Sequence, residues 1–135
     1  MKNSRRMPMG VLLTSPLLLV AAGTALAQDV VKVSPETHRV LLENAQVRAM
    51  DVRLKPGEKV AMHSHPASIL YYLSDAKVKI TYPDGKTEER EVTAGTAAWS
   101  EAVTHAVENV GITDLHEVHT ELKQTAEQPG HAKKD

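Results

Sequence analysis

Apolar and polar positions alternate along most of the chain from about residue 39 onward. Residues 77–82 read Lys-Val-Lys-Ile-Thr-Tyr, which places apolar side chains on one face of a strand and polar side chains on the other. A period of two is typical of β-strands with one buried face. No segment after residue 27 shows convincing helical periodicity. The pattern therefore predicts an all-β domain.

Turn-forming residues interrupt this pattern at short intervals. They occur at Lys55-Pro56-Gly57-Glu58, Ser74-Asp75, Pro83-Asp84-Gly85-Lys86, Ala94-Gly95 and Asn109-Val110-Gly111. The clearest hairpin is expected between residues 78–82 and 87–92, because Asp84-Gly85 supplies the positive φ angles of a tight turn. Eight or nine short strands separated in this way predict one small antiparallel β-barrel over residues 38–123.

The segments on either side of the barrel have a different character. Residues 28–37 are interpreted as a loosely held N-terminal arm, and residues 124–135 as a polar C-terminal tail. His38, at the head of the first strand, is interpreted as a surface residue. His131 lies in the tail beside two lysines and is interpreted as solvated.

The first 27 residues have the three parts of a secretory signal peptide. A basic start precedes an apolar run over residues 11–22, and Ala25-Leu26-Ala27 provides small residues before the expected cleavage site. We expect a mature protein that is periplasmic or secreted and not held by a membrane. An uncleaved membrane anchor is the alternative, and Ser4-Arg5-Arg6 leaves a twin-arginine export route open.

Composition and charge exclude several classes of function. The 135-residue chain has no cysteine, which excludes disulfides, thiolate metal sites and cysteine nucleophiles. Three of its 16 basic residues lie in the first 27 positions, so the remainder carries 13 bases against 17 acids. An excess of acids argues against a nucleic-acid partner, which requires a basic face, and against a polybasic membrane surface.

Histidines provide the candidate chemistry. His63 and His65 are separated by one residue, and side chains two apart on a strand point to the same face. Both imidazoles can therefore reach one point, as half of a metal site does. Paired surface histidines are the alternative. A third histidine, His105, is followed four residues later by Asn109.

These residues resemble the two sequence motifs of the cupin family. The matching positions are Gly57, His63, His65, His105 and Asn109. Gly95 corresponds to the first glycine of the second motif, but it stands one residue closer to His105 than the family pattern asks. The resemblance covers about residues 47–123. It implies a small jelly-roll barrel whose inward histidines bind a divalent metal ion at one end.

The chain departs from the cupin pattern at an important position. The glutamate that completes the first motif falls on Ile69 or Leu70, neither of which binds a metal. The resemblance then leaves three neutral ligands, namely His63, His65 and His105. Such a set suits Fe(II) with dioxygen and a bidentate substrate, or a water on Zn(II). The alternative is a cupin that has lost its metal and keeps the imidazoles as buried polar groups.

Four further residues are predicted to lie near the site. Strand parity counted from the histidine pair places Ile69 and Tyr71 inward, where the Tyr71 hydroxyl would reach a ligand. Trp99 is expected to wall the mouth of the barrel. On the last strand, His116 is expected to point inward with Val118, Thr120 and Leu122, as a partner or replacement ligand. His119 is expected to point outward with the neighbouring glutamates.

Three functions fit these predictions. The first is a dioxygenase-type oxidoreductase that acts on a small organic substrate. The second is a non-catalytic protein that binds a small ligand or a partner, with or without metal. The third is an isomerase or lyase with Glu101 or His116 as base.

Two further expectations concern ligand charge and assembly. The basic residues near the barrel are all expected outside it or in turns, which argues against sugar-phosphate ligands; they are Lys77, Lys79, Lys86 and Arg90. We also expect a homodimer, because residues 47–54 are expected to form an open strand edge that needs cover.

Overall fold

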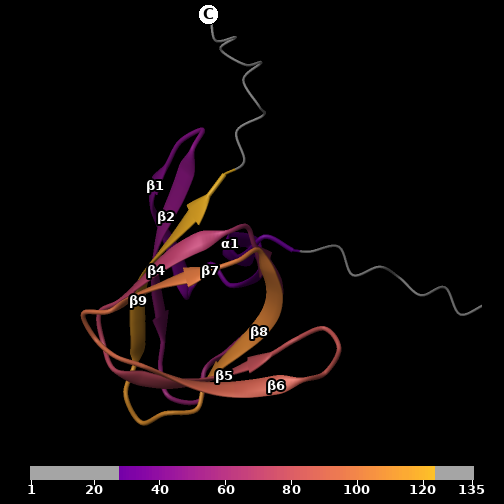
Figure 1. The fold of residues 1–135 in the computed structure, drawn as a ribbon, viewed down its shortest axis with the longest axis vertical. Helices are drawn as coiled ribbons and strands as arrows, with labels where there is room; N and C mark the ends of the chain where they lie inside the picture. Colours follow the sequence, from indigo (N-terminus) through magenta and orange to yellow (C-terminus); the bar gives the residue numbers. More distant parts are fainter. Residues whose placement is uncertain (1–27, 124–135) are drawn as a thin grey trace, which may run out of the picture.

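The computed structural model describes residues 28–123 (Figure 1). The predictions that concern the signal peptide, the polar tail and His131 lie outside these residues. The described elements are α1 (Val30–Val33), β1 (His38–Glu43), β2 (Val47–Leu54), β3 (Lys59–His65), β4 (Ser68–Tyr72), β5 (Ala76–Thr81), β6 (Thr87–Val92), β7 (Ala97–Ser100), β8 (Val103–Asn109) and β9 (Leu115–Leu122).

The strands form two antiparallel sheets. One has five strands in the order β1-β2-β9-β4-β7, and the other has four in the order β3-β8-β5-β6. Side chains from both sheets line a shared interior. This arrangement confirms the predicted all-β jelly-roll class. Within residues 28–123 the hydrogen bonding does not continue from one sheet into the other, so the sheets face each other without closing into a barrel.

The predicted central hairpin is confirmed. β5 pairs with β6 in regular register from Ala76 opposite Val92 to Thr81 opposite Thr87. Gly85 has a φ of +83°, a conformation that favours glycine, and its amide donates to the Tyr82 carbonyl at 2.9 Å. The turn sequence therefore sets the register of both strands.

Apolar side chains from both sheets make up the core. They are Val30, Met50, Val52, Leu54, Val60, Tyr72, Ala76, Val78, Ile80, Val92 and Leu115. Most come from alternate positions of β2, β3, β5 and β9, as the period of two requires. This core forms the base on which the polar residues of the interior are held.

The N-terminal arm is packed, which corrects the expectation that residues 28–37 are loosely held. The Asp29 carboxylate accepts the Val31 amide at 3.0 Å and caps α1. Val30 has no exposed surface and belongs to the core. His38, which follows the arm, is buried rather than on the surface. The sequence signal for α1 was weak because the helix has only four residues.

The predicted open strand edge lies elsewhere in the sheet. β2 lies between β1 and β9, so residues 47–54 are hydrogen-bonded on both sides. β1 and β7 are the outer strands of this sheet, and Val40, Leu41 and Leu42 on β1 are exposed. The homodimer remains a prediction, and residues 47–54 do not provide the open edge that was expected for it. No helix in the described part of the chain has the length and apolarity needed to span a membrane.

Candidate metal centre

Two neighbouring strands bring the three predicted ligands together. His63 on β3 is the direct cross-strand partner of His105 on β8, and His65 lies two residues further along the same face. The ring centroids of His63 lie 4.7 Å from those of His65 and 4.8 Å from those of His105. One ring nitrogen from each of the three residues lies within 4.8 Å of the others.

Hydrogen bonds fix the ring orientation of two of these imidazoles. The Nδ1 atom of His63 lies 2.7 Å from the Ala61 carbonyl, and that of His65 lies 2.6 Å from Glu121 Oε1. A carbonyl or carboxylate oxygen only accepts, so both Nδ1 atoms carry the proton and donate. The Nε2 atoms are then unprotonated and free to bind a metal ion.

Burial keeps the cluster uncharged. It lowers the pKa of His65 to about 2, with further lowering from His119 and His63. It lowers the pKa of His105 to about 3, again with a contribution from the neighbouring histidines. Burial also lowers the pKa of His63. Neutral imidazoles are the form that binds metal ions, so the site is ready for a cation at neutral pH.

The donor set fits a divalent transition-metal ion. Three imidazole nitrogens suit zinc, iron, copper or nickel, and a metal–nitrogen bond is about 2.0–2.1 Å long for zinc. With the nitrogens within 4.8 Å of one another, at most a small inward movement of the rings is needed. Leu70, which lines the cavity, occupies one of the two positions where a cupin glutamate would stand. The three candidate ligands are therefore all neutral.

An acidic and basic network supports His65 from behind. Glu121 on β9 accepts from His65 through Oε1 and from Arg48 Nε through Oε2, the latter at 2.7 Å. Arg48 Nη1 also donates to both carboxylate oxygens of Asp29, at 3.0 and 2.9 Å. The sequence analysis missed this network, because its members lie far apart in the chain. An inward arginine directly opposite Glu121 on β2 is the signal that marks it.

Two further histidines lie beside the cluster. His119 stacks on His65 with ring centroids 4.2 Å apart, and its Nε2 lies 2.9 Å from Ser68 Oγ. His38 lies 6.0 Å from His63 between ring centroids, and its Nδ1 makes a 2.8 Å hydrogen bond with Thr37 Oγ1. Burial lowers the pKa of His38 to about 3. The interior therefore holds five imidazoles, of which three form the candidate site.

The last strand has the opposite parity to the prediction. His119, Glu117 and Glu121 face the interior, whereas His116 faces outward and makes a 2.8 Å hydrogen bond to Asp51. The prediction assigned the interior to Val118, Thr120 and Leu122, and His116 with them. This assignment is wrong because the interior is polar beside the histidines. The buried face of β9 carries Glu121 and His119, which contact His65. His116 is therefore not a ligand, and His119 takes the interior position.

The parity of β4 is also reversed. Ile69 and Tyr71 are 44% and 45% exposed, and Leu70 and Tyr72 face the cavity instead. The prediction carried the strand register on from His65. β3 ends at that residue, however, and the chain crosses at Pro66 to the other sheet, where alternation starts anew.

Trp99 lines the cavity as predicted, but its partner removes a candidate base. Its indole Nε1 donates to Glu101 Oε1 at 2.6 Å, and Glu101 is exposed. Glu101 therefore holds the ring at the mouth and does not face the interior. The carboxylate that does line the cavity is Glu117.

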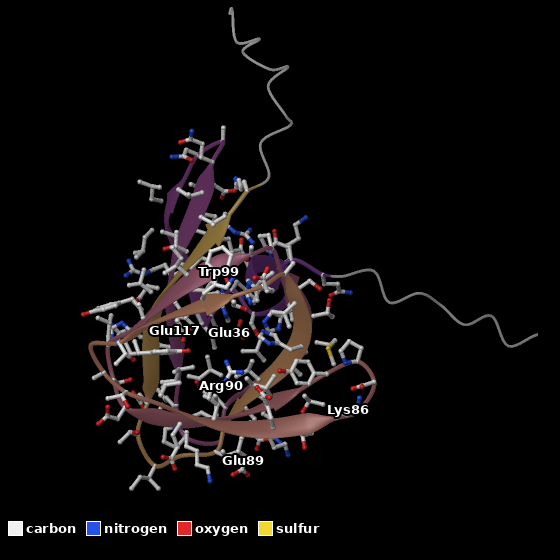
Figure 2. The ribbon with its side chains drawn as sticks, viewed as in Figure 1. Glu36, Lys86, Glu89, Arg90, Trp99 and Glu117 are labelled. Atoms are coloured by element: carbon white, nitrogen blue, oxygen red, sulfur yellow. The ribbon has the colours of Figure 1, made fainter. Side chains whose placement is uncertain are left out.

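A cavity of about 110 Å³ opens beside the three histidines. Its other walls are mainly aliphatic and aromatic, with Leu70, Tyr72, Tyr82 and Trp99 among them. Arg90 also lines it, which corrects the expectation that this residue lies outside. Arg90 is the cross-strand partner of the inward Val78, and Figure 2 shows it on the inner side of β6, with Glu89 on the outer side.

Asn109, the last residue of the second motif, has a structural role. It is fully buried, and its Nδ2 donates to the carbonyls of Leu54 and Thr113, both at 2.8 Å. Its Oδ1 accepts the Gly111 amide at 3.0 Å. The residue thus holds the turn after β8 and keeps that strand, with His105, in register.

Comparisons with known proteins agree on the architecture. No protein-family model matches the sequence, and a search of curated proteins finds no significant match. Among solved structures, a cupin domain from Bordetella pertussis is similar with a TM-score of 0.60 at 24% identity, covering 64% of this chain and 92% of that one.

Two further solved structures show the same likeness. A protein from Bacillus halodurans has a TM-score of 0.53 at 17% identity and covers 70% of this chain and 75% of its own. An RmlC-like cupin with a double-stranded β-helix from Methanocaldococcus jannaschii has a TM-score of 0.52 at 14% identity, with 64% and 78% covered. At these identities the comparisons establish the fold and leave the chemistry to the residues of the site.

Proposed function

We propose that this chain, which has the cupin fold, binds a divalent metal ion through His63, His65 and His105 and acts with it on a small organic ligand. The observation that supports this most is the meeting of three neutral imidazoles at one end of a largely apolar cavity. Two of the three have their Nε2 atoms freed by hydrogen bonds at Nδ1.

The proposed activity is that of a dioxygenase-type oxidoreductase. Fe(II) held by three neutral ligands supplies redox chemistry with dioxygen, and Zn(II) in the same place supplies a Lewis acid. The chain itself contributes the rest. The imidazoles hold the ion, and the aliphatic walls exclude water and bind the apolar body of a ligand.

The cavity also limits which ligands fit. Its small volume and apolar lining favour a compact organic molecule whose donor atoms reach the histidine end. Arg90 lines the cavity from the opposite sheet to β9, and it offers a partner for one acidic group on the ligand. Glu117 faces the same space, so a ligand with several negative charges is disfavoured.

A non-catalytic binding protein is the second candidate. Leu70 stands where a carboxylate ligand would be, and this apolar residue beside the histidines favours capture of an apolar molecule without turnover. An isomerase or lyase is less well supported, because both of its predicted bases face away from the cavity. His116 is bound to Asp51, and Glu101 is bound to Trp99.

Elemental analysis of the untagged protein tests the metal site. We expect near-stoichiometric metal in the unaltered protein and little in a His63→Ala, His105→Ala double variant. His116→Ala is the matched control, because it removes an imidazole from the outer face, and its metal content should equal that of the unaltered protein. Equal metal in the double variant, or none in the unaltered protein after anaerobic reconstitution, would contradict the proposal.

The identity of the metal then selects the activity assay. With iron, oxygen uptake is measured against thiols, diketones and hydroxy acids. Uptake above background with the unaltered protein, but not with the double variant, supports the dioxygenase. Ligand binding without turnover supports the second candidate.

We also propose that the protein is exported, with Gln28 as the first mature residue. The proposal rests on the signal-peptide pattern of the first 27 residues. Mass spectrometry of the protein from the periplasm or medium should give a chain that starts at Gln28. A chain that keeps residues 1–27 and stays with the membrane would contradict it.

A homodimer is proposed through β1. This strand is one of the two outer strands of its sheet and exposes Val40, Leu41 and Leu42, and an apolar edge of this kind benefits from cover. Light scattering at micromolar concentration should give twice the chain mass. A Leu41→Lys, Leu42→Lys variant should be monomeric, and a monomer in the unaltered protein would rule the dimer out.

A further inference from the structure

The segment of residues 28–33 lies against the strand that carries two of the three candidate ligands. The Ser64 amide, between His63 and His65, donates to the Gln28 carbonyl at 3.0 Å, and Asp29 pairs with Ser64 in a parallel bridge. β3 is an outer strand of its sheet, so the segment covers a free edge. Val30 anchors it in the core. We refer to residues 28–33 as the N-terminal clamp.

A continuous chain of side-chain hydrogen bonds runs from the clamp to the site. Asp29 accepts two hydrogen bonds from Arg48, Arg48 donates to Glu121, and Glu121 accepts from His65. Hydrogen bonds from Arg48 lower the pKa of Asp29, so its carboxylate is ionised at neutral pH. The side chains of Arg48, Glu121 and His65 are 12%, 3% and 2% exposed.

Burial makes each member of this chain depend on the next. Glu121 has one oxygen on Arg48 and the other on His65, so the direction of the arginine sets the direction of the carboxylate. Arg48 in turn lies between two carboxylates, and its fork fixes its plane on both. Loss of the Asp29 charge would free the Arg48 side chain to rotate toward Glu121. The Glu121 carboxylate would then reorient, and its hydrogen bond with His65 would change.

We propose that Asp29 is a positioning residue of the metal centre, acting through Arg48 and Glu121 on His65, so that docking of the N-terminal clamp and metal affinity are coupled. The inference rests on the proposed metal site. Coupling of this kind is reciprocal, because whatever the clamp does for the ion, the ion does for the clamp. Metal binding should therefore hold residues 28–33 more firmly in place.

Co(II) titration of the full chain tests the coupling. Asp29→Asn removes the charge but keeps a side chain that caps α1, since asparagine is as good an N-cap as aspartate. We expect Co(II) affinity to fall about tenfold, the lower end of the effect of outer partners of metal ligands, with a shift in the visible absorption bands of the bound ion. A merely structural role would leave those bands unchanged.

Asp51→Asn is the matched control. Asp51 lies on the same strand as Arg48 and, like Asp29, accepts hydrogen bonds from arginine. Its partners are two arginines and a histidine on the outer face. Its affinity for Co(II) and its absorption bands should match those of the unaltered protein. Asp29→Glu should restore most of the affinity, because it returns the charge to Arg48.

A second variant and a second measurement keep the test decisive if Asp29→Asn folds poorly. Arg48→Lys keeps the positive charge but lacks the fork that binds both carboxylates, so we expect a comparable loss of affinity. Hydrogen exchange should show slower exchange at the Ser64 amide, which donates to the clamp, when Co(II) is added to the unaltered protein.

The outcomes separate the inference from the function on which it rests. Equal Co(II) affinity and spectra in the unaltered protein, Asp29→Asn and Arg48→Lys would overturn the coupling alone. No Co(II) binding by the unaltered protein would overturn both the metal site and the coupling. An equal loss of Co(II) affinity in Asp51→Asn and Asp29→Asn would overturn the coupling, since the effect would then follow from general destabilisation.

Discussion

On each of its faces, β9 takes part in one hydrogen-bonded carboxylate–histidine pair with another strand. Inside, Glu121 of β9 and His65 lie 2.6 Å apart, with side chains 3% and 2% exposed. Outside, His116 of β9 and Asp51 lie 2.8 Å apart, with side chains 22% and 14% exposed. The groups and distances are nearly the same. What differs is the access of water. Water competes for the groups of the outer pair and weakens it, whereas its exclusion from the interior strengthens the inner pair.

This difference teaches that the contact alone does not define the role. Both members of the inner pair have further neighbours. Arg48 donates to the Glu121 carboxylate, and the imidazole of His65 lies close to the other two candidate ligands. The outer pair ends in exposed arginines at the surface. A carboxylate–imidazole contact therefore holds a candidate ligand in place on the inner face, whereas on the outer face the pair makes only solvent-accessible contacts, with arginines at its carboxylate.

Removal of the two carboxylates should separate the pairs most strongly. Glu121→Ala leaves His65 Nδ1 without its acceptor and leaves Arg48 with Asp29 alone, and we expect a loss of about 3–5 kcal/mol in the free energy of unfolding. Asp51→Ala should cost about 1 kcal/mol or less. Urea denaturation measures both, and equal losses would show that burial does not distinguish the pairs.

A carboxylate added to β4 tests the same contrast. Leu70→Glu places a charge beside the histidines, so the metal-free protein should lose about 2–4 kcal/mol while the stabilisation by added Zn(II) increases. Ile69→Glu is the matched outward change and should alter each value by about 0.5 kcal/mol or less. Thermal unfolding with and without Zn(II) checks both. A larger effect at Ile69 would contradict the parity of β4.

Acid should destabilise the inner cluster. The folded-state pKa values of His38, His65 and His105 are about 3, 2 and 3, against 6.5 for a free histidine. Below pH 6.5 the unfolded chain therefore binds more protons than the folded one. The stability present above this pH falls as pH drops, by up to about 1.4 kcal/mol per pH unit for each residue.

The measurement for this effect is metal-free unfolding in urea between pH 7 and pH 4. His116→Ala, on the outer face, should leave the slope of stability against pH nearly unchanged. A His105→Gln variant should make it shallower. An unfolding free energy that stays constant over this range would contradict the neutral buried cluster.

The smallest effect is expected at Tyr71. Its side chain faces outward, so Tyr71→Phe should change the free energy of unfolding by about 0.5 kcal/mol or less and leave ligand affinity unchanged. Tyr72→Phe, on the inner face, removes a hydroxyl from the cavity lining and should alter ligand affinity. Titration of the same ligand into both variants compares their ligand affinities.

The sequence carried enough information for the fold and for the meeting of His63, His65 and His105 at one place. Alternation and turn residues predicted the strands, and the i, i+2 spacing of His63 and His65 survives because β3 is continuous through both. Parity failed where a strand ends and the chain changes sheet, as it does after His65, and where both faces of a strand carry titratable side chains, as in β9.

The supporting network was beyond the reach of local patterns. Arg48 and Glu121 are 73 residues apart, and their pairing follows only from the antiparallel register of β2 and β9. His38 and residues 28–37 were missed for a similar reason. Their burial depends on the strand edge and core that the rest of the chain provides.

The position of Trp99 makes its intrinsic fluorescence a reporter of the cavity. It is the single tryptophan of the chain, half exposed at the cavity wall and tethered to Glu101. Its emission therefore reports one place without interference from any other indole. A ligand that enters the cavity displaces water from this ring, and a paramagnetic ion at the histidines quenches it. Occupancy of the interior can thus be followed by fluorescence in the unlabelled protein.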